Sequence, residues 1–140
     1  MEFDLSEYEQ PPYYETLGIE ITDVEPGYAE GRLPLDSSIS SSRSTAVAHG
    51  GAISSLADSV GYWAVSAAND FATTPTIDIR VDYLAPATSD LHATATVVRN
   101  GSSVGVVDAV VECESDRVAT ARGVFKTGGG SGESAWDAPE

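Results

Sequence analysis

Two glycines and one carboxylate are spaced so that they could do chemistry together. Gly50 and Gly51 follow His49, and Asp58 lies seven residues after Gly51. On a helix this separation is two turns, or about 10 Å of rise, so both positions point to the same side. The first N–H groups of a helix have no partner within it, and glycines leave them open to polarise a carbonyl oxygen. Asp58 could then act on water as a general base, or attack as a nucleophile.

Each of these residues also fits a purely structural role. A Gly-Gly pair is often only a turn or a point of close packing. His49 could cap the helix or belong to the preceding loop, and Asp58 could be the ion-pair partner of an arginine. The spacing alone therefore leaves catalysis and structure open.

A helix over residues 49–69 is expected to carry these groups. Its apolar residues recur every three or four positions, which is the helical period: Ile53, Leu56, Ala57, Val60, Ala64, Ala67 and Ala68. Asp58 is the only charged residue between Arg43 and Asp70. The segment should therefore be the most buried element, and a lone carboxylate there is costly unless it is paired or functional.

Alternating apolar residues predict strands on both sides of this helix. Leu17, Ile19 and Ile21 begin a hairpin that turns at Pro26-Gly27 and returns to Leu35. Four later strands are expected over 77–83, 91–99, 105–113 and 118–126, with a hairpin turn at Asn100-Gly101. The order predicts an α+β fold in which an antiparallel sheet of five to six strands wraps around one long central helix.

The composition narrows the classes of partner. The chain has 22 acidic and 7 basic residues, giving a formal charge of -15, and Lys126 is its only lysine. Nucleic acids and anionic membranes need a positive surface, so both are disfavoured. Dispersed acidity with so little lysine is typical of proteins that work in molar salt, where charge repulsion is screened. The single cysteine excludes an internal disulfide framework, and no cluster has metal-ligand spacing, so no metal is expected.

The chain is expected to form one cytoplasmic domain with two short extensions. Residues 1–12 should be a flexible acidic segment, with a short helix or lid after the Pro11-Pro12 pair. Residues 13–127 should form the folded domain, and the glycine-rich residues 128–140 a flexible tail. The start of the sequence lacks the pattern of a signal peptide, and no apolar run is long enough to span a membrane.

The ordered motifs resemble a known family. His49-Gly50-Gly51 followed by Leu56-Ala57-Asp58 resembles the signature of the PaaI-type acyl-CoA thioesterases of the hotdog superfamily. The resemblance extends over residues 13–127. It includes the segments 13–19, 76–78, 82–86, 99–103 and 119–123.

The resemblance implies a hotdog homodimer, often a dimer of dimers, with active sites at subunit interfaces. The Gly51 N–H would polarise the thioester carbonyl, and Asp58 of the facing subunit would activate water or attack. His49 would orient the site and Thr76 would assist Asp58. CoA would arrive as part of the substrate rather than as a cofactor. Residues that would hold the substrate are Gly50, Arg43, Tyr62, Tyr83, Leu84, Ala85, Pro86, Arg99, Gly101 and Ser102.

Two features depart from the family pattern. Arg43 stands where the family often has an asparagine, and it cannot accept a hydrogen bond from the attacking water. It could instead bind a phosphate or carboxylate. Strict alternation also places Thr76 with Asp78 and Arg80, off the apolar face of its strand, which weakens its predicted role. Alternatives to a thioesterase are a non-catalytic acyl-CoA-binding hotdog protein and a hotdog hydratase or dehydratase.

Overall fold

A computed structural model describes residues 4–128 of the chain. One six-stranded antiparallel sheet has the strand order β1-β2-β4-β5-β6-β3. Its strands are β1 (Glu20–Glu25), β2 (Tyr28–Leu33), β3 (Thr76–Tyr83), β4 (Leu91–Asn100), β5 (Val104–Cys113) and β6 (Asp116–Lys126). The helices are α1 (Pro12–Leu17) and α2 (Gly50–Ala67), with single 3-10 turns at Leu5–Glu7 and Ser37–Ile39.

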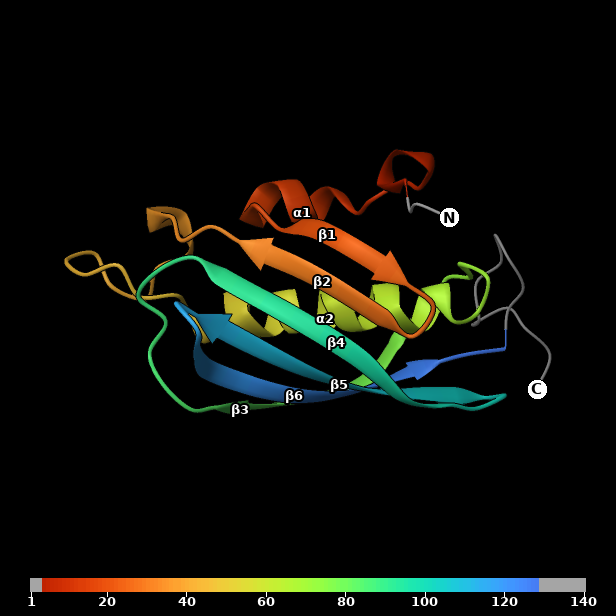
Figure 1. Cartoon of the computed structure of the whole chain (residues 1–140). Helices are drawn as coiled ribbons and strands as arrows, with labels where there is room; N and C mark the ends of the chain where they lie inside the picture. Colours follow the sequence, from red (N-terminus) through yellow and green to blue (C-terminus); the bar gives the residue numbers. More distant parts are fainter. Residues whose placement is uncertain (1–3, 129–140) are drawn as a thin grey trace.

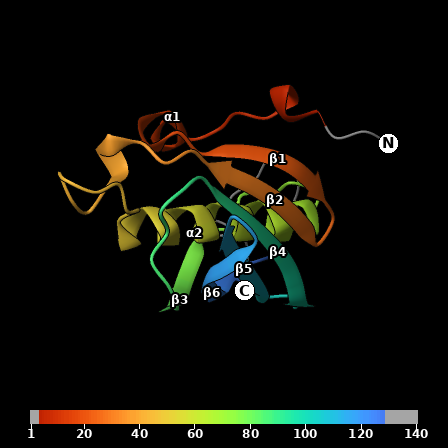
Figure 2. The same ribbon diagram turned by 60° about the vertical axis from the view of Figure 1, so that its left-hand side comes forward.

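The long helix α2 lies against one face of the sheet, and the sheet curves around it (Figures 1 and 2). Leu56, Val60 and Phe125 are completely buried between these two layers. Gly31 and Gly61 permit the close approach, because a Cβ at either would come within 3.1 Å of a neighbouring side chain. The predicted central helix and hotdog architecture are thus confirmed.

One prediction about the strands is wrong in detail. Leu17 ends helix α1 and is not part of the first strand, because Gly18 follows with a φ of 95° and turns the chain before β1. The apolar side chains of Tyr83 and Ile77 are exposed, with exposed fractions of 54% and 49%. Both belong to β3, which lies at the edge of the sheet.

The N-terminal segment packs on the helix layer. Tyr8 stacks on Phe71 at 4.4 Å between ring centroids, and Trp63 Nε1 donates to Tyr14 Oη at 3.2 Å. The segment therefore reaches the side of α2 that also carries Asp58. The predicted tail lies outside the described residues except for Gly128.

Between residues 4 and 128, no helix is both long and apolar enough to cross a membrane.

Candidate active site

His49 caps the N-terminus of α2. Its Nδ1 accepts a hydrogen bond of 2.8 Å from the Gly51 N–H. A neutral imidazole has one donor and one acceptor nitrogen, so an accepting Nδ1 places the proton on Nε2. The capping role weighed for His49 is confirmed, and its Nε2–H is left as a donor on an exposed side chain.

The same cap decides which backbone donor is open to a ligand. The Gly51 N–H is already bound to His49, whereas the Gly50 N–H has no hydrogen-bond partner within residues 4–128. Gly50 is also the first residue of α2, where the helix dipole is positive. The structure therefore offers Gly50 rather than Gly51 as the open N–H donor at this end of the helix.

A shallow hollow adjoins this helix start. Tyr83 Oη donates to the Gly50 carbonyl at 2.9 Å, and its ring packs on the Gly50 backbone. The hollow has a volume of about 450 Å³ and continues along Leu84, Ala85 and Pro86. Five of the residues expected to hold substrate therefore lie together, because β3 ends beside the start of α2.

Asp58 lies in a second pocket, farther along α2, with a volume of about 350 Å³. Thr76 Oγ1 donates to Asp58 Oδ1 at 2.7 Å, and the described residues give this carboxylate no Lys, Arg or His partner. Burial raises the pKa of Asp58 above its ordinary value, and the Thr76 bond offsets this only in part. A half-buried carboxylate that lacks a counter-charge is costly to maintain, and such groups cluster at functional sites.

The position of Thr76 corrects the prediction from strict alternation. The pairing of β3 with β6 shifts register between Thr76 and Asp78, which marks a β-bulge at Ile77. One extra residue reverses the side on which the preceding residue projects. Thr76 therefore faces α2 and reaches Asp58, while Asp78 and Arg80 face the opposite side.

Tyrosines form much of the pocket wall around Asp58. Tyr13 and Tyr14 come from α1, and Tyr62 lies one helical turn beyond Asp58. Tyr13 Oη shares a 2.9 Å hydrogen bond with Ser55 Oγ, which ties α1 to α2. Tyr62, one of the residues expected to hold substrate, thus lines the pocket that contains Asp58.

Two serines of this pocket were missed by sequence reasoning. Ser55 and Ser59 line it beside Asp58. Ser55 Oγ bonds the Gly51 carbonyl at 2.8 Å and Ser59 Oγ bonds the Ser55 carbonyl at 2.7 Å. The helical period could have found them, since Ser55 lies three residues before Asp58 and Ser59 lies four residues after Ser55.

The remaining expected substrate residues lie elsewhere in this chain. Arg43 opens into a separate hollow of the serine-rich loop, with Ser40 and its neighbours. Arg99, Gly101 and Ser102 lie at the β4–β5 turn, whose Asn100 Nδ2 bonds Ala68 at the far end of α2. The residues of the β4–β5 turn therefore lie near the opposite end of α2 from Gly50, along a helix about 27 Å long, and do not line the hollow at Gly50.

The two polar centres on α2 are also separated from each other. Asp58 follows Gly50 by two helical turns or more, about 12 Å of rise. Each centre opens into its own hollow. One small carbonyl group cannot touch both within a single chain. No group of three or more His, Cys, Asp or Glu side chains among the described residues is arranged to hold a metal ion.

Comparison with known families matches this arrangement. Residues 45–120, which include α2 and both polar centres, match the family model described as the Thioesterase superfamily. The chain belongs to this family. The match confirms the hotdog resemblance, and it places this member of the thioesterase superfamily among thioester hydrolases in general.

Individual relatives agree with the family. A provisionally named esterase of Halobacterium salinarum is 36% identical over 121 residues, covering 79% of this chain and 80% of the relative. The structure of the E. coli PaaI protein, from the phenylacetic acid degradation operon, is 26% identical with a TM-score of 0.79 and covers 90% of this chain and 91% of that chain. A conserved protein of Pseudomonas aeruginosa is 29% identical with a TM-score of 0.78, covering 84% and 94%.

Proposed function

We propose that this protein hydrolyses an acyl-CoA thioester in a site built by two copies of the chain. Asp58 of one copy would act on water, and the Gly50 N–H of the other would hold the thioester carbonyl oxygen. The observation that carries the proposal is the Asp58 carboxylate. It faces a pocket, has a raised pKa and is bonded by Thr76 without a counter-charge.

The free edge of β3 supports pairing of two copies. Among the described strands, β3 is bonded to β6 alone, so its other side presents unpaired N–H and C=O groups. Exposed apolar side chains accompany this edge at Ile77, Tyr83 and Leu84. An unpaired apolar edge is a template for another strand. We infer that two β3 strands pair antiparallel across a two-fold axis.

This pairing would bring the polar centre at Asp58 of one copy close to the polar centre at Gly50 of the other. The first residue of β3, Thr76, contacts Asp58, and the last, Tyr83, contacts Gly50. An antiparallel pair brings the start of one strand next to the end of the other. Asp58 of one copy would then face Gly50 of its partner, which two sites on one helix cannot do.

The chemistry follows from these groups. Asp58, ionised above its raised pKa, removes a proton as the water oxygen bonds to the thioester carbon. The carbonyl oxygen becomes an oxyanion, which the Gly50 N–H and the helix dipole stabilise. When the oxyanion collapses, the carbon–sulfur bond breaks and the CoA thiolate leaves with the electron pair. The products are the free acid and CoA. The pocket beside Tyr13 and Tyr62 would receive the acyl group.

Complementation between two inactive variants tests the shared site. Gly50→Pro removes the N–H at the first helical position, where proline fits the helix. Gly50→Ala is its matched control, because it keeps the N–H while adding a Cβ beside Tyr83. Asp58→Asn removes the base with little change of shape. Thiol release from aromatic and aliphatic acyl-CoA would be measured in molar KCl, which screens the repulsion between CoA and this acidic protein.

We expect Gly50→Pro and Asp58→Asn to be inactive alone, and Gly50→Ala to retain turnover. After co-refolding of equal amounts, half of the dimers are mixed and each mixed dimer contains one intact site. Activity should return to about a quarter of wild type, as two-fold symmetry requires. No recovery would contradict the shared site. CoA binding without thiol release by the wild type would instead favour a non-catalytic binding protein.

A further inference from the structure

Two consecutive residues just after α2 have a backbone conformation that L residues with side chains rarely adopt. Asp70 has a φ of 55° and Phe71 a φ of 61°, both in the left-handed region. Aspartate is tolerated there because its short side chain can bond locally, whereas a bulky phenylalanine is an outlier. Such a conformation persists only where surrounding contacts hold it, and strain of this kind gathers at functional sites.

Aromatic rings from two other segments hold Phe71. Tyr8, from the N-terminal segment, stacks on Phe71 with 4.4 Å between ring centroids and an interplanar angle of 23°. Trp63, one helical turn before the end of α2, lies 6.4 Å from Phe71 and 6.1 Å from Tyr8. Aromatic pairs at such distances add stability beyond the burial of their area. The three rings therefore tie the turn after α2 to the helix and to the N-terminal segment.

This turn sends the chain back toward Asp58. The Phe71 N–H donates to the Ser66 carbonyl at 2.8 Å, and Ser66 Oγ donates to the Ala72 carbonyl at 2.7 Å. Ala72 therefore lies beside Ser66, which follows Asp58 by eight residues on α2. The chain then runs back toward the start of the helix as β3 (Figure 1), and the first residue of β3, Thr76, bonds Asp58.

The return path has almost no slack. The eight residues from Asp58 to Ser66 rise about 12 Å along the helix. The four residue steps from Ala72 to Thr76 span at most about 14 Å, even when fully extended. Pro75 keeps this stretch extended, because proline fixes its own φ and disfavours the helical region for the residue before it. A change in the turn should therefore move Thr76, since no spare residues can absorb it.

Thr76 lies where this stretched segment joins the sheet. It precedes the β-bulge at Ile77, so the continuous register of β3 with β6 begins only at Asp78. On the other side of Thr76, the Lys126 N–H donates to the Pro75 carbonyl at 2.8 Å. Because a bulge interrupts the ladder locally, the backbone at Thr76 can follow a movement of the turn.

We propose that Tyr8 and Phe71 are positioning residues, whose stack holds the turn after α2 in the conformation that places Thr76 against Asp58. The two rings act on the pocket indirectly, because neither of them lines it. The titratable side chains that line it besides Asp58 are Tyr13, Tyr14 and Tyr62. The role of Asp58 rests on the proposed function, but its bond to Thr76 belongs to the folded chain whether or not a thioester is hydrolysed.

Variants that remove one ring of the stack test this arrangement. Tyr8→Ala removes the ring of the N-terminal segment, whereas Tyr8→Phe keeps the stack and loses only the hydroxyl. Phe71→Gly removes the other ring, and glycine accepts the left-handed backbone without strain, so this variant should fold even if Tyr8→Ala does not. Tyr28→Ala, which removes another half-buried tyrosine from β2, is the matched control.

Two quantities are measured in molar KCl, with circular dichroism to verify folding. Carbon NMR follows the pKa of the Asp58 carboxyl, whose signal is identified by its absence in Asp58→Asn. Thiol release from acyl-CoA gives the pH profile of kcat. The hydrogen bond from Thr76 lowers the pKa of Asp58, so a displaced Thr76 should raise that pKa.

Tyr8→Ala and Phe71→Gly should raise the pKa of Asp58 and lower kcat several-fold at neutral pH, while Tyr8→Phe and Tyr28→Ala match the wild type. Adding Tyr8→Ala to Thr76→Val should shift the pKa no further than Thr76→Val alone, because both changes remove the same contact. A wild-type pKa in a folded Tyr8→Ala or Phe71→Gly variant would overturn the proposal, as would additive shifts in the double variant. The expected pKa shifts in a protein without thioesterase turnover would leave the positioning role intact and overturn the proposed function alone.

Discussion

Two aspartates on opposite sides of the sheet have opposite electrostatic environments. Asp58, on the helix side, lies half-buried in a pocket with Thr76 as its partner, and burial raises its pKa. Asp108, on the outer face, is exposed, and the hydrogen bonds from Arg122 lower its pKa. Both residue types are the same, so the surroundings alone account for the difference.

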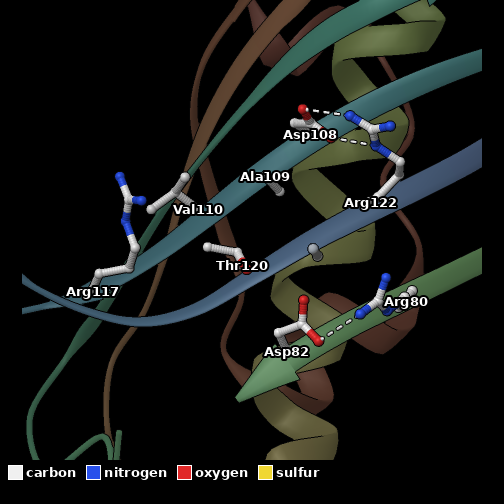
Figure 3. Close-up of a pocket in the computed structure, with 9 residues that line it drawn as sticks. Arg80, Asp82, Asp108, Ala109, Val110, Arg117, Thr120 and Arg122 are labelled. Atoms are coloured by element: carbon white, nitrogen blue, oxygen red, sulfur yellow. Dashed lines mark hydrogen bonds and ion pairs between the residues drawn. The ribbon is translucent and has the colours of Figure 1, made fainter. Parts of the chain in front are cut away.

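The contrast separates a carboxylate that can accept a proton from one that is held in an ion pair (Asp108 in Figure 3). A carboxylate fully bonded to a guanidinium is a weak base, whereas one with a raised pKa and a single neutral donor accepts a proton more readily. Asp58 therefore has the properties of a general base, and Asp108 those of half of an ion pair. The same substitution, Asp to Asn, can be made at each position in turn to test this distinction.

The largest expected effect is on turnover. Asp58→Asn should lower kcat for acyl-CoA hydrolysis by about 10²- to 10⁴-fold, the usual contribution of a general base. Asp108→Asn, which makes the same chemical change on the outer face, should leave turnover per chain within about 2-fold, since exposed ion pairs contribute little. Thiol release and circular dichroism would be measured on both. Equal losses of turnover in the two folded variants would contradict the distinction.

A smaller effect is expected from removing the hydroxyl that bonds Asp58. The Thr76 bond lowers the pKa of Asp58, so Thr76→Val should raise that pKa further. The acidic limb of the kcat profile should then move to higher pH, with a loss of about 10-fold at neutral pH from a misplaced base. Thr76→Ser, which keeps the hydroxyl, should follow the wild-type profile. An unshifted limb in Thr76→Val would show that Asp58 is not the group being titrated.

The sequence predicted the helix side of this comparison better than the outer face. The helical spacing of apolar residues such as Leu56 and Val60 predicts α2. The absence of other charged residues between Arg43 and Asp70 indicates that Asp58 is partly buried. The Asn100-Gly101 hairpin also follows from local pattern and is confirmed. These features depend on residues close in sequence, where periodicity is informative.

The remaining features depend on register, which periodicity does not specify. Strict alternation placed Thr76 on the wrong side because the bulge at Ile77 cannot be read from residue types. The pairing of Asp108 with Arg122 needs the β5–β6 register. His49 engages the Gly51 N–H through a loop conformation that the Gly-Gly motif alone does not define.

The smallest expected effect is on stability, and replacing the two aspartates should change Tm in opposite directions. A carboxyl whose pKa is raised on folding destabilises the folded protein once the pH is above that pKa, so Asp58→Asn should raise Tm at neutral pH. Asp108 has a lowered pKa, so its stabilisation is present above the ordinary pKa of 3.8 and is lost as the pH falls through the lowered value.

Asp108→Asn should therefore lower Tm at neutral pH. The loss of unfolding free energy should be less than about 1 kcal/mol, because the ion pair is exposed. The two variants should converge on the wild-type Tm as the pH falls and both carboxyls become protonated. Thermal unfolding at fixed molar KCl across this pH range measures both signs together. A Tm that falls at neutral pH in Asp58→Asn would mean that its carboxylate stabilises the fold, and the case for a strained catalytic base would be lost.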